Sequence, residues 1–249
     1  MSDQRAWQVV LGRIESDLAA GVLKPGDHLA PERALATELG VGRSSVREAV
    51  RVLEVLGLVR TQTGSGPSSG AVITAAPSDG MSVLMRLQVA AQGFGVDDVV
   101  RTRLLLETAV VGELAALAGP DLAEADTLLA AMDDDGHTSA EFLALDAQFH
   151  LALAAAAGNQ VVTATMAGLR TSIERYVLIG AARLSSWAPV ATRLRAEHRS
   201  IVAAVRAHDA DGARRHLHDH ITGYYAQTFA PVPSSPDPTR PVPHPSKES

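Results

Sequence analysis

One helical segment of the sequence carries groups that bind metal ions on its apolar side. Over 140–157, apolar residues recur at helical spacing, among them Phe142 and Phe149. Asp146 falls at the centre of this apolar stripe, and His150 lies one turn later. A carboxylate on an apolar face is costly unless it is paired or bound to a metal. Since no Lys or Arg lies within a turn of Asp146 on this segment, a metal is a candidate partner.

Two later helical segments add histidines to the same kind of face. His198 lies in the middle of the apolar stripe of 190–207, and His220 borders the stripe of 210–229. Imidazole and carboxylate ligands suit Zn, Ni, Fe or Mn, and three His with one Asp leave coordination positions open for water or a ligand. The pattern therefore predicts a divalent metal site, with Zn, Ni or Mn as the expected ions.

A hydrogen-bonded polar core is the alternative interpretation of these residues. A single inward histidine is usually a core residue, and Asp146 with His150 could form only a local hydrogen bond. Three segments that each turn such groups inward favour the metal. His216 and His218 lie further from the apolar stripe of their segment and are not expected to be ligands.

The composition indicates a largely helical protein. The chain has 249 residues, of which 46% are hydrophobic and only 4% are aromatic, as in helices packed on helices. It contains no cysteine, which excludes disulfides, thiolate zinc sites and cysteine nucleophiles. With no signal peptide and no apolar run long enough to cross a membrane, we expect a cytoplasmic protein without a membrane partner.

The first part of the chain has the spacing of a helix-turn-helix. Two short helices, 32–39 and 43–56, are joined by the tight turn 40–42. Four arginines crowd the stretch from 43 to 60, although the whole chain has a net charge of −6. The N-terminal part of a recognition helix reaches base edges in the major groove, and Arg can bind guanine with two hydrogen bonds.

A hairpin follows this motif. Strands are expected at 58–61 and 71–74, and the Gly/Ser-rich segment between them forms the tip of a wing. The predicted DNA-contacting residues of the recognition region and the wing are Arg33, Arg43, Ser44, Ser45, Arg47, Gly64 and Gly66.

The expected architecture is mainly α. A winged helix-turn-helix domain covers 1–75, a linker covers 76–80, and an all-helical antiparallel bundle of about seven helices covers 81–230. Residues 231–249 contain seven prolines and no periodicity, which is typical of a disordered tail.

Residues 8–74 resemble the GntR superfamily. The matching residues are Lys24-Pro25-Gly26-Asp27, Pro31-Glu32-Arg33, Leu39-Gly40-Val41-Gly42-Arg43 and Val46-Arg47-Glu48-Ala49. This resemblance implies that Arg33, Arg43 and Arg47 contact DNA and that a homodimer binds a palindromic operator. The wing departs from the family pattern, since it ends in Ser68-Ser69-Gly70-Ala71-Val72 in place of a Gly-rich run before an aromatic residue.

Residues 80–226 resemble the FCD domain, the effector-binding domain of FadR-type GntR regulators. The matching residues are Asp146-x-x-Phe149-His150, Gly158-Asn159, Glu197-His198-x-x-Ile201 and His220-Ile221. The resemblance implies that Asp146, His150, His198 and His220 bind a metal that anchors a small organic acid. Arg103 is similar to the buried arginine of the family and would bind the effector carboxylate, its alternative being a salt bridge to Glu107; Arg175 is a second candidate.

Three functions follow from these patterns. The first is a ligand-responsive transcriptional repressor. The second is an enzyme in which the metal activates water, but no further inward Glu or His is placed as a general base. The third is a direct metal sensor, which would bind its operator in a metal-dependent way without any organic ligand.

Overall fold

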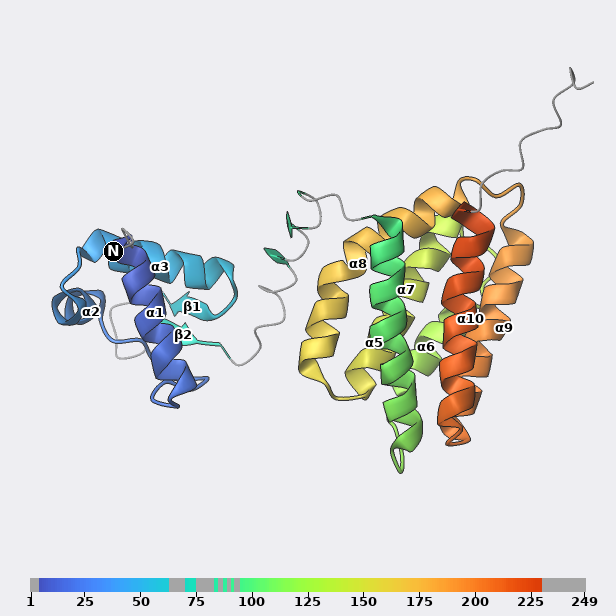
Figure 1. The fold of residues 1–249 in the computed structure, drawn as a ribbon, viewed down its shortest axis with the longest axis horizontal. Helices are drawn as coiled ribbons and strands as arrows, with labels where there is room; N and C mark the ends of the chain where they lie inside the picture. Colours follow the sequence, from blue (N-terminus) through green and yellow to red (C-terminus); the bar gives the residue numbers. More distant parts are fainter. Residues whose placement is uncertain are drawn as a thin grey trace, which may run out of the picture.

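The computed structural model describes two bodies of packed elements. The residues described are 5–62, 70–74, 83–84, 87–88, 91 and 95–229. Each body has its own hydrophobic core, one built from residues between 7 and 73 and the other from residues between 96 and 229 (Figure 1). The predicted linker at 76–80 and the tail at 231–249 lie outside the described residues.

The N-terminal body is a helix-turn-helix with a small antiparallel sheet. Its elements are α1 (Ala6–Ala19), α2 (Glu32–Leu39), α3 (Arg43–Val55), β1 (Val59–Gln62) and β2 (Gly70–Ile73). Val10, Ile14 and Val46 are almost fully buried between the three helices. The turn after α2 begins at Gly40, whose φ of 64° lies in the left-handed region that glycine adopts without strain.

The strands of the hairpin differ slightly from the prediction. They begin and end one residue away from the predicted 58–61 and 71–74, and Val59 pairs with Ile73 in antiparallel register. The N–H of Leu58 donates to the carbonyl of Leu53, which prolongs the end of α3 and delays the first strand by one residue.

The C-terminal body is an all-helical bundle. Its helices are α5 (Val96–Ala116), α6 (Ala123–Ala131), α7 (Ser139–Ala156), α8 (Gln160–Ala181), α9 (Ala188–Arg206) and α10 (Ala210–Phe229). These are six helices within 95–229, and the predicted helical segments 140–157, 190–207 and 210–229 correspond to α7, α9 and α10. The fold class is as predicted, mainly α with one two-stranded sheet among the described residues.

Two helices position the centre of this bundle. Helix α7 is buried on several sides, with Phe142 and Phe149 inaccessible to solvent. It begins with a capping box in which Thr138 and Glu141 satisfy each other's backbone N–H groups. Helix α10 packs against both α5 and α9 (Figure 1).

None of the helices described is long and apolar enough to cross a membrane.

Candidate metal centre and nucleic-acid interface

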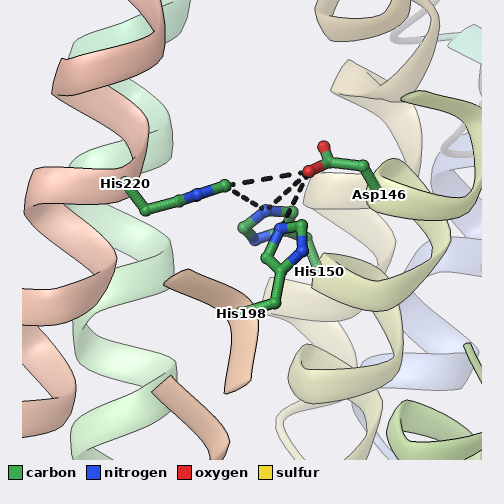
Figure 2. Close-up of side chains that lie close together, drawn as sticks. All are labelled: Asp146, His150, His198 and His220. Carbon is green, nitrogen blue, oxygen red and sulfur yellow. Dashed lines mark hydrogen bonds and ion pairs between the residues drawn. The ribbon is translucent and has the colours of Figure 1, made fainter. Parts of the chain in front are cut away.

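The four predicted ligands come together in the middle of the bundle. Asp146 and His150 lie on α7, His198 lies on α9 and His220 lies on α10 (Figure 2). All four side chains are buried, and His198 has no exposed surface. One ligand atom from each residue lies within 4.8 Å of all the others. The structure thus brings together residues from three helices that are far apart in the sequence.

The spacing of the ligand atoms fits a first-row metal ion. Oδ1 of Asp146 lies 2.9 Å from Nε2 of His198 and 3.8 Å from Nε2 of both His150 and His220. The Nε2 atoms of His150 and His220 are 3.2 Å apart. Metal–ligand bonds of about 2.0–2.2 Å in a tetrahedral arrangement place ligand atoms roughly 3.4 Å apart. These four separations, from 2.9 to 3.8 Å, lie on either side of this value.

The hydrogen bonding of His198 favours a metal over a polar core. This imidazole is fully buried, and its Nδ1 atom has no hydrogen-bond partner among the described residues. Its Nε2 atom is close to Asp146 but makes no well-directed hydrogen bond to it. Buried polar atoms are nearly always hydrogen-bonded, so an imidazole of this kind needs another partner. A metal ion bound through Nε2 would be one.

The electrostatics keep the ligands in the protonation states that metal binding requires. Burial, reinforced by the nearby His198, lowers the pKa of His220 to about 4, and burial also lowers the pKa of His198. Burial alone would raise the pKa of Asp146, but the surrounding histidines hold it well below its usual range. At neutral pH the carboxylate is charged and these two imidazoles are neutral, as metal ligands must be.

Two glutamates that we did not predict as site residues lie next to the histidines, at the ring nitrogen that faces away from the cluster. Oε2 of Glu107 lies 2.6 Å from Nδ1 of His150, and Oε2 of Glu197 lies 2.9 Å from Nδ1 of His220. Glu107 also pairs with Arg103, whose Nε lies 2.7 Å from Oε1. The salt bridge to Glu107, which was the alternative role considered for Arg103, is therefore present, and both side chains are buried.

Two concave spaces adjoin the ligand cluster. One is lined by Asp146, His220, Tyr225 and apolar residues of α7 to α10, and the other is lined by His150, Glu107, Arg170 and apolar residues of α7 and α8. Each has room for about one water molecule. Arg103 lines both of them. A small ligand would enter either space only if the lining side chains moved apart.

The two predicted effector-binding arginines occupy different environments. Arg103 is buried beside the cluster, whereas Arg175 is exposed on α8 and is absent from the lining of both spaces. Arg170, which was not predicted, is half-buried on α8 and lines the larger space. Arg103 therefore lies beside the candidate metal ligands, and Arg175 does not.

The predicted DNA-contacting residues cluster around the start of α3. Arg33, Arg43, Ser44 and Arg47 are exposed, and Ser45 is half-buried. Nε of Arg47 lies 3.4 Å from Oε2 of Glu32, an ion pair that is open to solvent on both sides. The other two predicted contacts, Gly64 and Gly66 in the wing, lie outside the described residues.

Comparison with known proteins identifies both halves of the chain. Residues 7–67 match the profile of the bacterial regulatory proteins of the gntR family, and residues 98–223 match the profile of the FCD domain. The chain belongs to the GntR family. It is a DNA-binding transcriptional regulator of the GntR/FCD type, and the members of this family that it resembles are regulators, not enzymes.

Individual relatives of this GntR-family chain regulate transcription in opposite directions. It is 30% identical over 233 residues to the Glc operon transcriptional activator of Escherichia coli (strain K12), covering 89% of each chain. It is also 30% identical over 214 residues to the HTH-type transcriptional repressor NanR of Enterobacter sp. (strain 638), covering 82% of this chain and 78% of the relative.

A solved structure agrees with the fold. Streptococcus agalactiae GntR superposes with a TM-score of 0.55 at 23% identity, covering 88% of this chain and 98% of that one.

Proposed function

We propose that this GntR-family regulator is a cytoplasmic repressor whose operator binding is controlled by a small organic acid held at a metal site. The convergence of four buried ligand atoms in the bundle carries this proposal. Asp146, His150, His198 and His220 would hold a Zn, Ni or Mn ion. When bound, the ion supplies a Lewis-acid position for an oxygen atom of the effector.

The surroundings of the cluster suit a small carboxylate. Arg103 lines both concave spaces, and its guanidinium is already paired through Nε with Glu107, so an effector carboxylate would bind its remaining N–H groups. The hydroxyl of Tyr225 is buried beside the guanidinium of Arg103, so an effector oxygen bound to Arg103 would lie close to it. Leu143, Val177 and Ile221 line the space beside Asp146 and His220 and leave room only for a short ligand.

The N-terminal body would read DNA with α3. In this proposal, the first turns of α3 enter the major groove, and Arg33, Arg43, Ser44, Ser45 and Arg47 contact the operator. Gly64 and Gly66 of the wing would contact the adjacent backbone or minor groove. A palindromic operator is read by a two-fold homodimer, one recognition helix per half-site.

Two measurements test the DNA-binding part of the proposal. Selection of bound duplexes from a randomised library should enrich a palindromic sequence. Light scattering of the purified chain should give the mass of a dimer. Enrichment of sequences without two-fold symmetry, or a monomeric mass at micromolar concentration, would contradict this mode of binding.

A thermal-shift screen tests the effector part. Small carboxylic acids should raise the melting temperature of the metal-loaded protein and should raise it much less after metal removal, because a ligand stabilises the state it binds. The same acid should change the affinity for the selected duplex. If metal alone switches duplex binding and no acid has an effect, the protein is a direct metal sensor, and the effector proposal is wrong.

A further inference from the structure

The two glutamates behind the metal ligands belong to matching arrangements on different helices. On α5, Glu107 binds Arg103 one turn before it through Oε1 and faces His150 through Oε2. On α9, Glu197 pairs with an arginine one turn before it through Oε1 and faces His220 through Oε2. In both cases the second carboxylate oxygen of an Arg–Glu pair at i,i+4 spacing lies close to the Nδ1 atom of a histidine. The contact is a hydrogen bond for His220 and a close contact without hydrogen-bond geometry for His150.

The Arg193–Glu197 pair on α9 makes a second contact with helix α10. Arg193, the partner of Glu197, also donates from Nη2 to Oε1 of Gln227 on α10, at 2.8 Å. Helix α10 also carries His220, so Arg193 and Glu197 of α9 both contact side chains of α10. Glu197 and Arg193 remain partly exposed, at 26% and 34%, whereas Glu107 and Arg103 are each 4% exposed.

A carboxylate in this position determines which nitrogen of an imidazole can bind a metal. A neutral imidazole carries one proton, and a carboxylate next to Nδ1 favours the form with the proton there. The Nε2 atom then has a free lone pair, and the ring cannot rotate away without losing the contact. His150 and His220 both direct Nε2 at the cluster, as this account requires.

We propose that Glu107 and Glu197 are positioning residues of the metal centre, and that Arg103 and Arg193 hold them in place. Each glutamate fixes the tautomer and the ring orientation of one histidine, so that Nε2 faces the ion. The inference rests on the proposed metal centre and extends it to residues that do not contact the ion. Glu107 has the larger effect, because its contacts are shielded from water.

Metal affinity in the full-length chain gives the first test. Competition for Zn²⁺ with a chromophoric chelator should show a loss of 10- to 100-fold for Glu107→Gln and for Glu197→Gln, the range typical for residues that orient metal ligands. Glu174→Gln is the matched control. Glu174 forms the same i,i+4 pair with Arg170 on α8, but no contact of its carboxylate with a histidine is found in the described part of the chain. Zinc affinities of both test variants equal to that of Glu174→Gln would overturn the proposal.

Histidine tautomers in the metal-free protein give a readout that a general loss of stability does not move. Long-range ¹H–¹⁵N spectra should show His150 and His220 protonated at Nδ1. Glu107→Gln should alter the signals of His150 alone, and Glu197→Gln those of His220 alone. Unchanged tautomers in both variants would overturn the positioning role. Failure of the wild type to bind zinc would overturn the metal centre itself. The spectra separate the two outcomes, because they report the tautomers without any metal present.

A second variant covers the case in which Glu107→Gln does not fold. Removing one member of a buried ion pair leaves the other charge unpaired, whereas replacing both charges avoids this cost. Arg103→Met with Glu107→Gln should therefore fold and still show weakened zinc binding. Wild-type affinity in the folded double variant would overturn the role of Glu107.

Discussion

The Nε2 atoms of His150 and His220 face each other at 3.2 Å, although 70 residues separate them in the chain. Each ring has a glutamate at its other nitrogen. When both protons lie on Nδ1, the two Nε2 atoms carry only lone pairs and cannot form a hydrogen bond with each other. A cation next to both atoms satisfies both, and this relationship underlies the first prediction.

Loss of an inward histidine should remove the metal. We expect His198→Ala and His220→Ala to contain no metal by elemental analysis after incubation with Zn²⁺ and gel filtration. His216→Ala is the control, since His216 is exposed on α10 and lies one turn from His220. Metal retained by His220→Ala but lost by His216→Ala would show that the wrong member of this pair was chosen.

The metal-free bundle should become less stable as the pH falls below 7. Burial lowers the pKa of His220 to about 4 in the folded protein, whereas an unfolded histidine titrates near 6.5. Between these values the unfolded chain binds a proton that the folded chain does not, so protonation favours unfolding. From pH 7 to 5 the free energy of unfolding should fall by about 2 kcal/mol through this residue.

Tryptophan fluorescence in urea can measure this effect in the bundle. Trp7→Phe leaves Trp187, which packs against the core of the bundle, as the only fluorophore of its kind. In the Trp7→Phe background, the free energy of unfolding of His220→Gln should depend less on pH between 7 and 5. Most carboxyl groups titrate below this range and contribute little. If the free energy of unfolding depends equally on pH with and without His220→Gln, His220 does not titrate as expected.

Arg47→Ala should weaken binding to the selected duplex. The side chain is exposed near the start of α3, and loss of one good base contact costs about 1–3 kcal/mol. Discrimination against mutated sites should fall as well, as gel shifts with point-mutated duplexes can measure. Arg101→Ala, which removes an exposed arginine on α5, should bind like the wild type. Equal affinities of Arg47→Ala and Arg101→Ala would refute the assignment of the recognition helix.

Gly180→Ala should destabilise the bundle where α8 meets α10. A Cβ atom at this position would lie 2.8 Å from Cβ of Thr228, which is almost fully buried. Relief of this overlap requires the helices to separate and should cost about 1–3 kcal/mol. Gly223→Ala is the matched control, because its new Cβ atom meets only Nη1 of Arg193 at 3.7 Å. It should be neutral or stabilising by up to about 1 kcal/mol, and both values follow from urea unfolding.

The four candidate ligands were predictable because the period of a helix fixes which side chains share its apolar face. Asp146 and His150 lie on one such face, and the same reasoning separates His220 from His216. The helix-turn-helix was predictable for a related reason, since its turn requires the left-handed Gly40 between two short apolar patterns.

The supporting residues were not predictable in this way. Whether Glu107 of α5 meets His150 of α7 depends on how two helices pack and rotate, and no periodicity within either segment contains that information. Arg170 and Arg175 of α8 are a further case, because the sequence alone does not show which of them turns toward the ligand cluster. The two arginines lie about 140° apart around the helix axis, and only Arg170 adjoins the lining that includes Met166 and Ile173.

The packing of α5 against α10 has a consequence for how the chain folds during synthesis. These are the first and last long helices of the bundle, so its core cannot close until residues near 229 have left the ribosome. The helix-turn-helix, whose core ends by residue 73, can fold much earlier. A nascent chain arrested before α10 would therefore present a folded reading head on a bundle that still exposes apolar surface and lacks His220. That intermediate is a natural substrate for chaperones.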